Sequence, residues 1–375
     1  MTIPAGESHP HKHHQVLAVI GAGAWGTTLA WLQSANFPRV QLFSAEADSV
    51  EEINGSHSNS RYLPGLVLPP NVTATDRLDA AVEGASTVIM AVPSRAFRQV
   101  AAGVIAHCDA AARMVLATKG LETGTGLLSL EVFREEAHQG EFGRRRRDPL
   151  VISGPNLAVE ISRGMPSVST LAGSDASEVR RAAAALSHQL LTLVPFGDPL
   201  GAQAAGALKN VYAIGCGMAA ALAWGDNAIA AILWRGLQET GRFARSISGT
   251  TAVVATPAGI GDMVATCTSP LSRNHDLGRT LAGGAGSEAV KGVREGAHTA
   301  LEAARRCRAL GLDLPLLDSI RGVLVGERKP EAVLQAACGS GRDAREGDGS
   351  RTQAEGCRGI PEAAIKGGWQ VAGSD

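Results

Sequence analysis

Val16-Leu17-Ala18-Val19-Ile20 runs directly into Gly21-Ala22-Gly23-Ala24-Trp25-Gly26, and this stretch decides the fold. A buried strand, a G-x-G-x-x-G turn and a helix together place a pyrophosphate on the helix N-terminus. Gly21 permits the tight turn, Gly23 lets the backbone approach the phosphates, and Gly26 lets helix and strand pack closely. Unpaired N–H groups and the positive end of the helix dipole then bind the anion. The motif alone is weakly specific in a chain with 45 glycines. Its place at the first strand–helix junction nevertheless predicts a dinucleotide-binding site.

The composition is that of an ordinary soluble globular protein, with 45% hydrophobic and 19% charged residues. A length of 375 residues predicts roughly two domains. The formal net charge of −1 gives no reason to expect a nucleic-acid or membrane partner. No apolar run reaches the ~18 residues of a membrane span, and residues 1–14 lack the apolar core of a signal peptide. None of the six cysteines forms C-x-x-C, so we expect reduced thiols and a cytoplasmic protein.

Two side-chain clusters have both a functional and a plain interpretation. The four histidines between His9 and His14 are potential metal ligands, but nothing nearby orients them, which favours a polar tail. The basic run at 144–147 is more typical of a solvated loop than of a nucleic-acid contact in a chain of balanced charge. We therefore expect neither a metal site nor a nucleic-acid site.

The first half of the chain alternates short apolar strands with helices, which predicts an α/β Rossmann-type domain with a parallel sheet covered on both faces. The expected strands span 15–20, 39–43, 87–92, 113–117, 150–153, 167–171 and 190–194. The expected helices span 25–35, 46–54, 95–106, 127–137, 156–163 and 175–188.

After Pro199 the pattern predicts an all-α C-terminal domain. Its expected helices span 201–223, 227–246 with Asp226 as N-cap, 258–267, 272–282, 297–310 and 314–325. The first of these is apolar nearly all round, which indicates burial on several sides or at a subunit interface. Because of the second alternative, we expect a homodimer. The expected domains are therefore 15–199 and 200–338, followed by a disordered polar tail at 339–375.

Three loops that follow expected strands carry polar residues: Pro93-Ser94-Arg95, Thr118-Lys119-Gly120-Leu121-Glu122 and Ser153-Gly154-Pro155-Asn156. In an open α/β sheet, ligands bind outside the carboxyl ends of the strands. If these strands share one sheet, the three loops and the glycine loop lie along one edge. This position, with the flanking Gly120, favours a site role for Lys119 over a solvated loop lysine.

The helical half offers a second polar group. Lys209 and Asn210 interrupt the most apolar helix, where an unpaired polar group is costly to bury. They indicate a polar pair that points into the cleft, and an interdomain ion pair or a wet helix edge is the alternative. Asp262 and Thr266 are four residues apart and share a helix face.

Ser272-Arg273-Asn274 opens the next helix, and arginine with asparagine at a helix start suits a phosphate or carboxylate. The plain alternative is an N-cap serine beside a surface arginine.

With these residues together, the chain resembles the NAD(P)-dependent glycerol-3-phosphate dehydrogenases of bacterial type, over about residues 16–338. The resemblance rests on motifs that follow one another in order: G-A-G-A-W-G-T at 21–27, Y-L-P-G at 62–65, L-P-P-N at 68–71, V-P-S at 92–94, K-G-L-E at 119–122, S-G-P at 153–155, L-K-N-V at 208–211, G-D-N at 225–227, R-G-L at 235–237, G-D at 261–262, T-C-T at 266–268, S-R-N at 272–274 and E-G at 295–296.

The resemblance implies reversible hydride transfer between dihydroxyacetone phosphate and sn-glycerol 3-phosphate, a phospholipid precursor. It implies catalytic roles for Lys209, as the acid/base, and for Lys119 and Asp262. The expected substrate contacts are Lys119, Gly154, Asn156, Asn210, Asp262, Thr266, Ser272, Arg273 and Asn274. The expected contacts to NAD or NADP are Gly21, Gly23, Ala24, Trp25, Gly26, Glu46, Lys119, Ala158, Arg273, Val293 and Glu295.

Three positions depart from the family pattern. Ala24 replaces a serine beside the pyrophosphate, and Asn156 replaces a small hydroxyl residue. Ala45 stands where a basic residue is common, and the adjacent Glu46 disfavours a 2′-phosphate, so we expect NAD to be preferred over NADP. The alternatives are a dehydrogenase of another small phosphorylated or carboxylated alcohol, and a silent paralogue that binds NAD(H) as a sensor.

Overall fold

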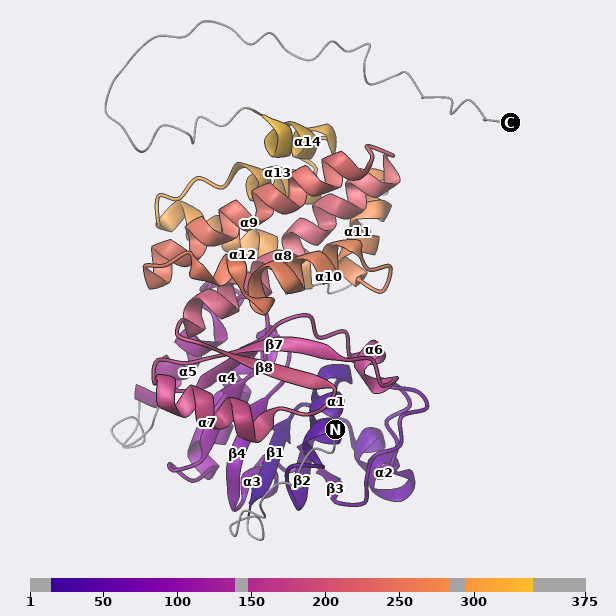
Figure 1. Ribbon diagram of the computed structural model, residues 1–375, viewed down its shortest axis with the longest axis vertical. Helices are drawn as coiled ribbons and strands as arrows, with labels where there is room; N and C mark the ends of the chain where they lie inside the picture. The colour runs from indigo at the N-terminus through magenta and orange to yellow at the C-terminus, as the bar shows by residue number, and fades with distance from the viewer. Residues whose placement is uncertain (1–14, 139–147, 284–294, 340–375) are drawn as a thin grey trace, which may run out of the picture. The chain divides into compact units, whose positions relative to one another are not determined.

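Strand β1 (Val16–Ile20) lies inside an eight-stranded sheet whose order is β3-β2-β1-β4-β5-β6-β7-β8 (Figure 1). The sheet belongs to a computed structural model that describes residues 15–138, 148–283 and 295–339. The other strands are β2 (Arg39–Phe43), β3 (Val72–Thr75), β4 (Ala85–Met90), β5 (Arg113–Leu116), β6 (Leu150–Ser153), β7 (Ser167–Ala172) and β8 (Leu191–Phe196). The seven expected strands are confirmed to within two residues at either end, and β3 is an addition.

Helices cover both faces of this sheet, as expected. They are α1 (Ala24–Gln33), α2 (Ala47–Ser56), α3 (Leu78–Val82), α4 (Ser94–His107), α5 (Ser129–His138), α6 (Ala158–Ser162) and α7 (Ala176–Leu186). Along β1, Leu17 and Val19 belong to one hydrophobic core, while Ala18 and Ile20 belong to another. A strand buried on both faces is continuously apolar, which is why the run before Gly21 shows no alternation.

The expected parallel sheet is confirmed except at one pair of strands. Strands β6 and β7 pair antiparallel, with Ile152 opposite Leu171, whereas the other pairs are parallel. The connection contains only the short α6 and a turn at Gly164, whose φ of 83° lies in the left-handed region. A connection this short reverses the chain without the full crossover helix that a parallel pair needs.

The rest of the chain is helical, also as expected. It contains α8 (Pro199–Ala221), α9 (Asp226–Ser248), η3 (Ala252–Ala255), η4 (Pro257–Gly261), α10 (Asp262–Thr268), α11 (Arg273–Ala282), α12 (Glu295–Ala309), α13 (Pro315–Leu324) and α14 (Glu331–Cys338). Two expectations are corrected. Gly225, with φ 84°, takes the N-cap position of α9, so Asp226 is its first helical residue. The helix expected at 258–267 divides into the π-helical turn η4 and α10.

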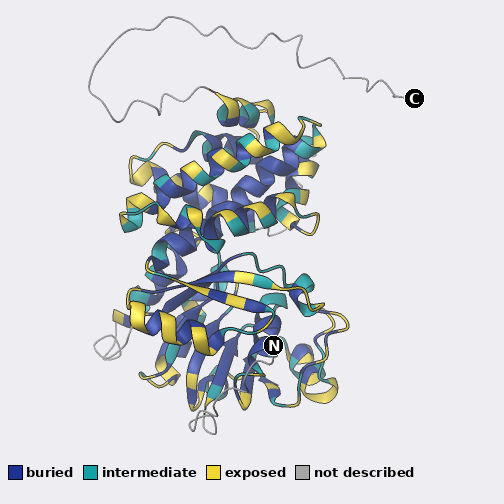
Figure 2. Ribbon diagram, in the orientation of Figure 1, coloured by how far each residue is buried: buried dark blue, intermediate teal, exposed yellow. Residues whose placement is uncertain are grey.

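Helix α8 is buried along nearly its whole length by other helices of its own chain (Figure 2). It crosses α11 with the two backbones almost in contact. A Cβ on Gly217 would lie 1.9 Å from the His275 carbonyl oxygen, and a Cβ on Gly278 would lie 2.0 Å from that of Ile214. The apolar surface of α8 is therefore explained within one chain, and it no longer indicates a subunit interface.

Three observations complete the fold. Within the described ranges, no helix is both long enough and apolar enough to cross a bilayer. The five described cysteines are free thiols. The expectations for the histidine cluster, the basic run at 144–147 and the tail after Gly339 fall outside the described residues.

Candidate active site

Four loops meet along one edge of the sheet. Strands β1, β4, β5 and β6 are neighbours and run parallel, so their carboxyl ends share that edge. The glycine loop touches the loop after β4, because a Cβ on Gly21 would lie 2.8 Å from the Ala91 carbonyl oxygen. The loop after β4 in turn touches the loop after β5, where a Cβ on Gly120 would lie 3.2 Å from Ser94 Oγ. The expected shared edge is confirmed.

The glycine loop has the shape that a dinucleotide requires. A Cβ on Gly26 would lie 1.8 Å from the Gly21 carbonyl oxygen, so only glycine lets α1 pack on the turn. A Cβ on Gly23 would meet nothing within 4 Å, which leaves open space at the N-terminus of α1. Within the described structure no side chain caps this N-terminus, and Trp25 Nε1 is buried without a hydrogen-bond partner. The N–H groups of the first turn therefore face a site that fits a pyrophosphate.

Glu46 lies at the carboxyl end of β2, directly before α2, where a dinucleotide-binding fold places the adenosine ribose. Its carboxylate accepts hydrogen bonds from the Tyr62 hydroxyl at 3.1 and 3.2 Å and from Ser49 Oγ at 3.2 Å. Arg61 Nη1 lies 3.0 Å from Glu46 Oε1. These contacts hold the Glu46 carboxylate at the end of β2, with the Arg61 guanidinium beside it.

Asp262 bridges the two lysines that the sequence singled out. Its Oδ2 accepts from Lys119 Nζ at 2.7 Å, and its Oδ1 accepts from Lys209 Nζ at 2.6 Å. Lys119 comes from the loop after β5, Lys209 from the middle of α8, and Asp262 from the start of α10. The sheet and the helical part of the chain therefore meet at one carboxylate, which is only 1% exposed.

Each ammonium has one further hydrogen bond. Lys119 Nζ donates to the Gly154 carbonyl oxygen at 2.8 Å, and Lys209 Nζ donates to Thr266 Oγ1 at 2.7 Å. An ammonium has three N–H donors. One N–H of each lysine therefore has no acceptor among the described residues, and it is available to a ligand.

Burial lowers the pKa of Lys119 to about 8, because desolvation disfavours its charged form. The Asp262 carboxylate opposes this shift, while the nearby Lys209 ammonium adds to it. The result is an ammonium whose proton is exchangeable near neutral pH.

A second polar group links α8 to α11 and α12. Asn274 Nδ2 donates to Asn210 Oδ1 at 2.9 Å, and Asn274 Oδ1 accepts from the Gly296 N–H at 3.2 Å. A Cβ on Gly296 would lie 2.6 Å from the Asn210 carbonyl oxygen, so glycine is needed for this contact. Ser272 caps α11 by accepting from the His275 N–H at 3.3 Å.

Positive charge dominates the region. Burial raises the pKa of Glu295, and four cations act against that shift, in the order Arg273, Lys209, Lys119 and Arg95. Arg273, the first residue of α11, is exposed. Four cations against two acids, Glu295 and Asp262, leave a field that attracts an anionic ligand.

The loop after β6 packs tightly under α8. A Cβ on Gly206 would lie 2.5 Å from Ser153 Oγ and 3.6 Å from Lys119 Cδ, so glycine lets the helix approach the loop. Asn156 Oδ1 accepts from Ser169 Oγ at 2.6 Å, while Asn156 Nδ2 is buried without a partner among the described residues. The same holds for Ser153 Oγ. Both atoms are polar groups for which a bound ligand would supply partners.

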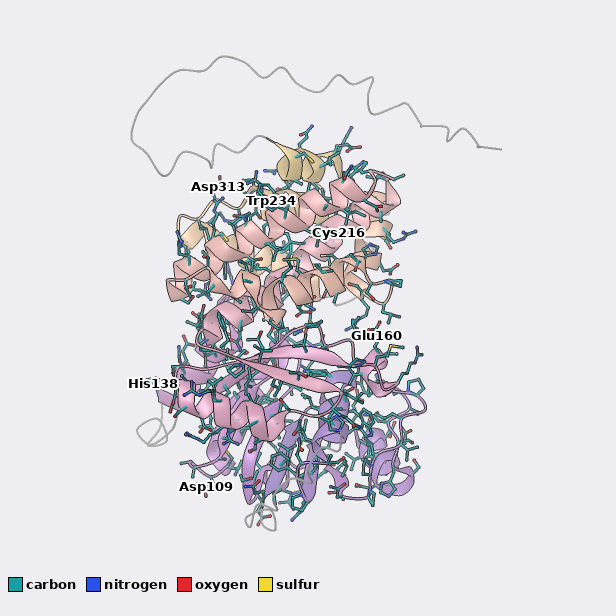
Figure 3. All side chains as sticks on the ribbon, viewed as in Figure 1. Asp109, His138, Glu160, Cys216, Trp234 and Asp313 are labelled. Atoms are coloured by element: carbon teal, nitrogen blue, oxygen red, sulfur yellow. The ribbon has the colours of Figure 1, made fainter. Side chains whose placement is uncertain are left out.

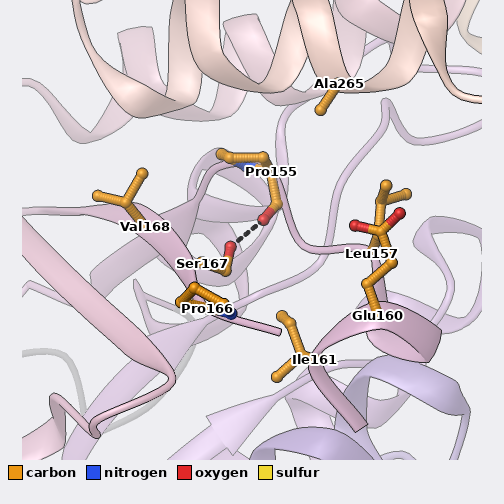
Figure 4. A pocket seen from close by; sticks show the side chains of 8 residues that line it. All are labelled: Pro155, Leu157, Glu160, Ile161, Pro166, Ser167, Val168 and Ala265. Carbon is orange, nitrogen blue, oxygen red and sulfur yellow. Dashed lines mark hydrogen bonds between the residues drawn. The ribbon is translucent and has the colours of Figure 1, made fainter. Parts of the chain in front are cut away.

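A cavity of about 380 Å³ adjoins this loop (Figure 4). The Ser167 hydroxyl donates to the Pro155 carbonyl at one wall of it. Its other lining residues are Leu157, Glu160, Ile161, Pro166, Val168 and Ala265. Neither Lys119 nor Lys209 lines this cavity. Two of its lining residues are nevertheless sequence neighbours of expected substrate contacts, because Pro155 follows Gly154 and Ala265 precedes Thr266.

Of the remaining expected cofactor contacts, Ala24 begins α1 and Ala158 begins α6. Val293 falls outside the described residues.

Comparisons with known proteins identify the family of this chain. The family model for the N-terminus of NAD-dependent glycerol-3-phosphate dehydrogenase matches residues 16–179, and the model for its C-terminus matches residues 198–335. This chain belongs to that family.

Among its relatives, glycerol-3-phosphate dehydrogenase [NAD(P)+] of Stenotrophomonas maltophilia is 38% identical over 327 residues, covering 85% of this chain and 93% of the relative. The protein of the same name from Chelativorans is 36% identical, covering 87% of this chain and 97% of the relative. The crystal structure of glycerol-3-phosphate dehydrogenase from Coxiella burnetii superposes with a TM-score of 0.79 at 32% identity, covering 87% of this chain and 99% of that one.

Sequence reasoning assigned no role to some residues that shape this dehydrogenase site. Asn59 Nδ2 donates to the Ala22 carbonyl at 2.8 Å and to Thr27 Oγ1 at 2.9 Å. These hydrogen bonds hold the glycine loop against the start of α1. Arg61 and Tyr62 hold Glu46. The Y-L-P-G motif at 62–65 marks this segment in the sequence, but a motif does not show which part of the fold its residues will contact.

Proposed function

We propose that this protein catalyses the reversible reduction of dihydroxyacetone phosphate by NAD(P)H to sn-glycerol 3-phosphate. The observation that carries the proposal is the Lys119–Asp262–Lys209 bridge on the same sheet edge as the glycine loop. This arrangement puts two ammonium groups, each with a spare N–H, beside a nucleotide-binding turn. Through this product, the protein would supply a precursor of phospholipids.

Lys209 is the proposed proton donor. NAD(P)H, when bound, supplies a hydride to the carbonyl carbon of the substrate, and the carbonyl oxygen then needs a proton. The spare N–H of Lys209 is available for that oxygen, while Asp262 and Thr266 fix the direction of the other two. In the reverse direction the neutral amine accepts the proton from the substrate hydroxyl.

The other cations hold the substrate. Arg273 and Asn274 open α11, where a guanidinium and the helix N-terminus bind a phosphate. Lys119, Asn210 and Thr266 surround the glycerol portion, and Gly154, Asn156 and Ser272 complete the proposed contacts. Binding the phosphate at a distance from the carbonyl converts binding energy into orientation of the reacting atoms.

NAD(H) is the proposed preferred cofactor. Glu46 at the end of β2 accepts hydrogen bonds from ribose hydroxyls and repels a 2′-phosphate. Gly21, Gly23, Ala24, Trp25 and Gly26 surround the pyrophosphate position. Ala158, Arg273, Glu295 and Val293 are proposed to contact the rest of the cofactor. Higher catalytic efficiency with NADPH than with NADH would contradict the preference.

Replacing Lys209 with Met tests the proposal. The proton donor is lost, so we expect kcat for dihydroxyacetone phosphate to fall about 10²- to 10⁴-fold, the range for general acid catalysis. The fall in NADH absorbance, together with identification of glycerol 3-phosphate as product, measures activity. NADH binding, measured by fluorescence, should persist. Lys329→Met is the matched control, because Lys329 is exposed and follows the last turn of α13.

Outcomes of the same assay separate the alternatives. A higher rate with another short polyol phosphate would favour a different dehydrogenase. Cofactor binding without turnover of any such substrate by the unmodified protein would favour a sensor. Unchanged activity in Lys209→Met would remove Lys209 from the reaction.

We also propose two domains, 15–199 and 200–338. The separate family models, which end at 179 and begin at 198, support a boundary there. The free cysteines support a reducing, cytoplasmic location.

We also propose a homodimer, and this proposal no longer rests on the apolar surface of α8. Trp234 of α9, which is labelled in Figure 3, is 55% exposed by area, and large aromatic residues are enriched at interfaces. Sedimentation of the protein and of Trp234→Lys tests this, with a dimer that dissociates in the variant as the expected result.

A further inference from the structure

Glu46 does not stand alone at the end of β2. Arg61 and Tyr62, from the loop between α2 and β3, reach its carboxylate from outside. Arg61 Nη1 is 3.0 Å from Oε1, and the Tyr62 hydroxyl is within 3.2 Å of both carboxylate oxygens. The strand end that would bind the adenosine ribose therefore carries both a carboxylate and a solvent-exposed guanidinium.

The Arg61–Glu46 pair is easily opened. The Arg61 side chain is 67% exposed and that of Glu46 is 38% exposed, so water and salt screen their attraction. The guanidinium carbon also lies 5.5 Å from the centre of the Tyr62 ring. This contact keeps the cation near the strand end when the ion pair is broken.

A phosphate dianion offers Arg61 a stronger partner than Glu46 does. A guanidinium binds phosphate through two parallel N–H···O bonds. Ala45, which precedes Glu46, carries no charge that competes for this role. Arg77, after the neighbouring strand β3, is held by Asp79 Oδ2 at 2.6 Å.

We propose that Arg61 sets the cofactor selectivity of this protein by changing partner. It stays on Glu46 when the adenosine ribose carries a 2′-hydroxyl, and it turns to the 2′-phosphate when one is present. NAD(H) and NADP(H) are then both accepted at one site, although Glu46 alone would exclude the second. The proposal rests on the nucleotide site of the proposed function and adds how that site discriminates.

Calorimetric binding of 2′,5′-ADP and 5′-AMP, without substrate, tests the exchange directly. These two probes differ only in the 2′-phosphate. In Arg61→Gln we expect the dissociation constant for 2′,5′-ADP to rise about tenfold or more, and that for 5′-AMP to change less than about twofold. In Glu46→Gln, 2′,5′-ADP should bind more tightly than it does to the unmodified protein.

Arg39→Gln is the control. Arg39 is an exposed arginine at the opposite end of β2. Replacing it removes the same charge at a position away from the proposed ribose site. We expect both probes to bind this variant as they bind the unmodified protein. Arg61 is exposed, and its variants should melt at the temperature of the unmodified protein.

Three results would overturn the proposal. Equal weakening of both probes in Arg61→Gln would make Arg61 a general nucleotide contact. Unchanged binding of 2′,5′-ADP would remove Arg61 from phosphate recognition, as would a selective loss in Arg77→Gln instead. In each case 5′-AMP binding by the unmodified protein preserves the proposed function, whereas its complete absence would overturn both.

Discussion

Asp262 is surrounded by more positive charge than it neutralises. One buried carboxylate accepts hydrogen bonds from two ammonium groups, each through a separate oxygen. Two cations and one anion leave an excess of positive charge in a region of low exposure. Burial raises the pKa of the neighbouring Glu295, so this second acid compensates only in part and the pair favours a further anion from a ligand. A phosphate-bearing substrate supplies it. The pair of lysines thus favours the same substrate class that Arg273 does.

The charge of Lys119 gives a pH prediction. Burial holds its pKa at about 8, so its ammonium is intact at pH 7 and lost as the pH rises through 8. We expect the KM for dihydroxyacetone phosphate to rise over that interval, because a neutral amine attracts the phosphate-bearing substrate less. Initial rates from pH 7 to 9.5 at constant ionic strength measure it.

Lys119→Gln is the companion variant. It should show a KM that is raised about tenfold at pH 7, for the loss of one charged hydrogen bond, and that no longer rises near pH 8. A KM that stays flat to pH 9.5 in the unmodified protein would contradict the prediction.

At the scale of single residues, the sequence predicts which side chains belong to the site better than it predicts which atoms they contact. Lys119, Lys209 and Asp262 stand out because each is a charged residue in an apolar or glycine-rich setting. Their bridge depends on contacts across 143 and 53 residues of chain, which no local pattern contains. Asn156 illustrates the limit, since its bond to Ser169 exists only because β6 and β7 are antiparallel.

The loop after β5 is held as a small hairpin between two regular elements. Leu121 pairs with Leu128, and the Glu122 carboxylate accepts two hydrogen bonds of 2.7 Å from Arg98 of α4. On its other side, Arg306 of α12 donates to the Gly126 carbonyl at 2.9 Å. The hairpin that carries Lys119 at its start is therefore fixed to α4 and to α12 together.

The contact between the hairpin and α12 can be tested by replacing Arg306. Arg306 also makes two bonds of 2.6 Å to Glu131 of α5, and its side chain is largely buried. In Arg306→Gln, Glu131 loses its cationic partner and keeps only the Leu128 N–H, so we expect the free energy of unfolding to fall by about 3 kcal/mol. The kcat/KM for dihydroxyacetone phosphate should fall as well, because the hairpin that starts at Lys119 loses its contact with α12. Urea denaturation and initial rates measure the two effects.

Arg308→Gln is the matched control, since Arg308 is exposed on the same helix. Unchanged stability in Arg306→Gln, or an equal loss in the control, would show that the hairpin does not depend on this contact.

Elements with a strong apolar or periodic signal were predictable, and two short elements without one, β3 and α3, were not. Helix α8 is a long apolar run, and β1 and β2 are apolar strands beside clear turns. In contrast, β3 is the four-residue edge strand Val-Thr-Ala-Thr, and α3 has five residues. Such segments are stabilised by neighbours rather than by their own pattern. The direction of β7 also depends on its neighbour, and therefore on the whole sheet.

At the scale of the molecule, α8 joins the site to the helical core. Lys209 and Asn210 lie near the middle of this helix, and two residues further on, the buried Tyr212 hydroxyl donates to Glu239 of α9 at 3.1 Å. The Glu239 carboxylate also accepts from the Leu316 and Leu317 N–H groups at 2.7 and 2.9 Å, at the start of α13. One fully buried carboxyl group therefore ties α8, α9 and α13 together.

Glu239 gives a prediction for global stability, in which two effects oppose each other. Burial raises its pKa to about 7 from the ordinary value of 4.5, while the backbone N–H groups and Tyr212 act in the opposite direction. Between pH 4.5 and 7 the folded state then binds more protons than the unfolded state. The contribution of this group is complete below pH 4.5 and is lost as the pH rises through 7. The loss amounts to about 3 kcal/mol for a shift of this size.

Glu239→Gln removes the titration but keeps the shape of the side chain. Its amide group cannot accept from both backbone N–H groups, so at pH 5 we expect it to be less stable than the unmodified protein by about 1–3 kcal/mol. The difference should shrink as the pH rises to 8, because only the unmodified protein must then bury a charge. Urea denaturation of both proteins at pH 5, 6, 7 and 8 measures this difference. A difference that instead grows with pH would mean that the three donors outweigh burial, and that the core of the helical region is built around a carboxylate rather than a carboxylic acid.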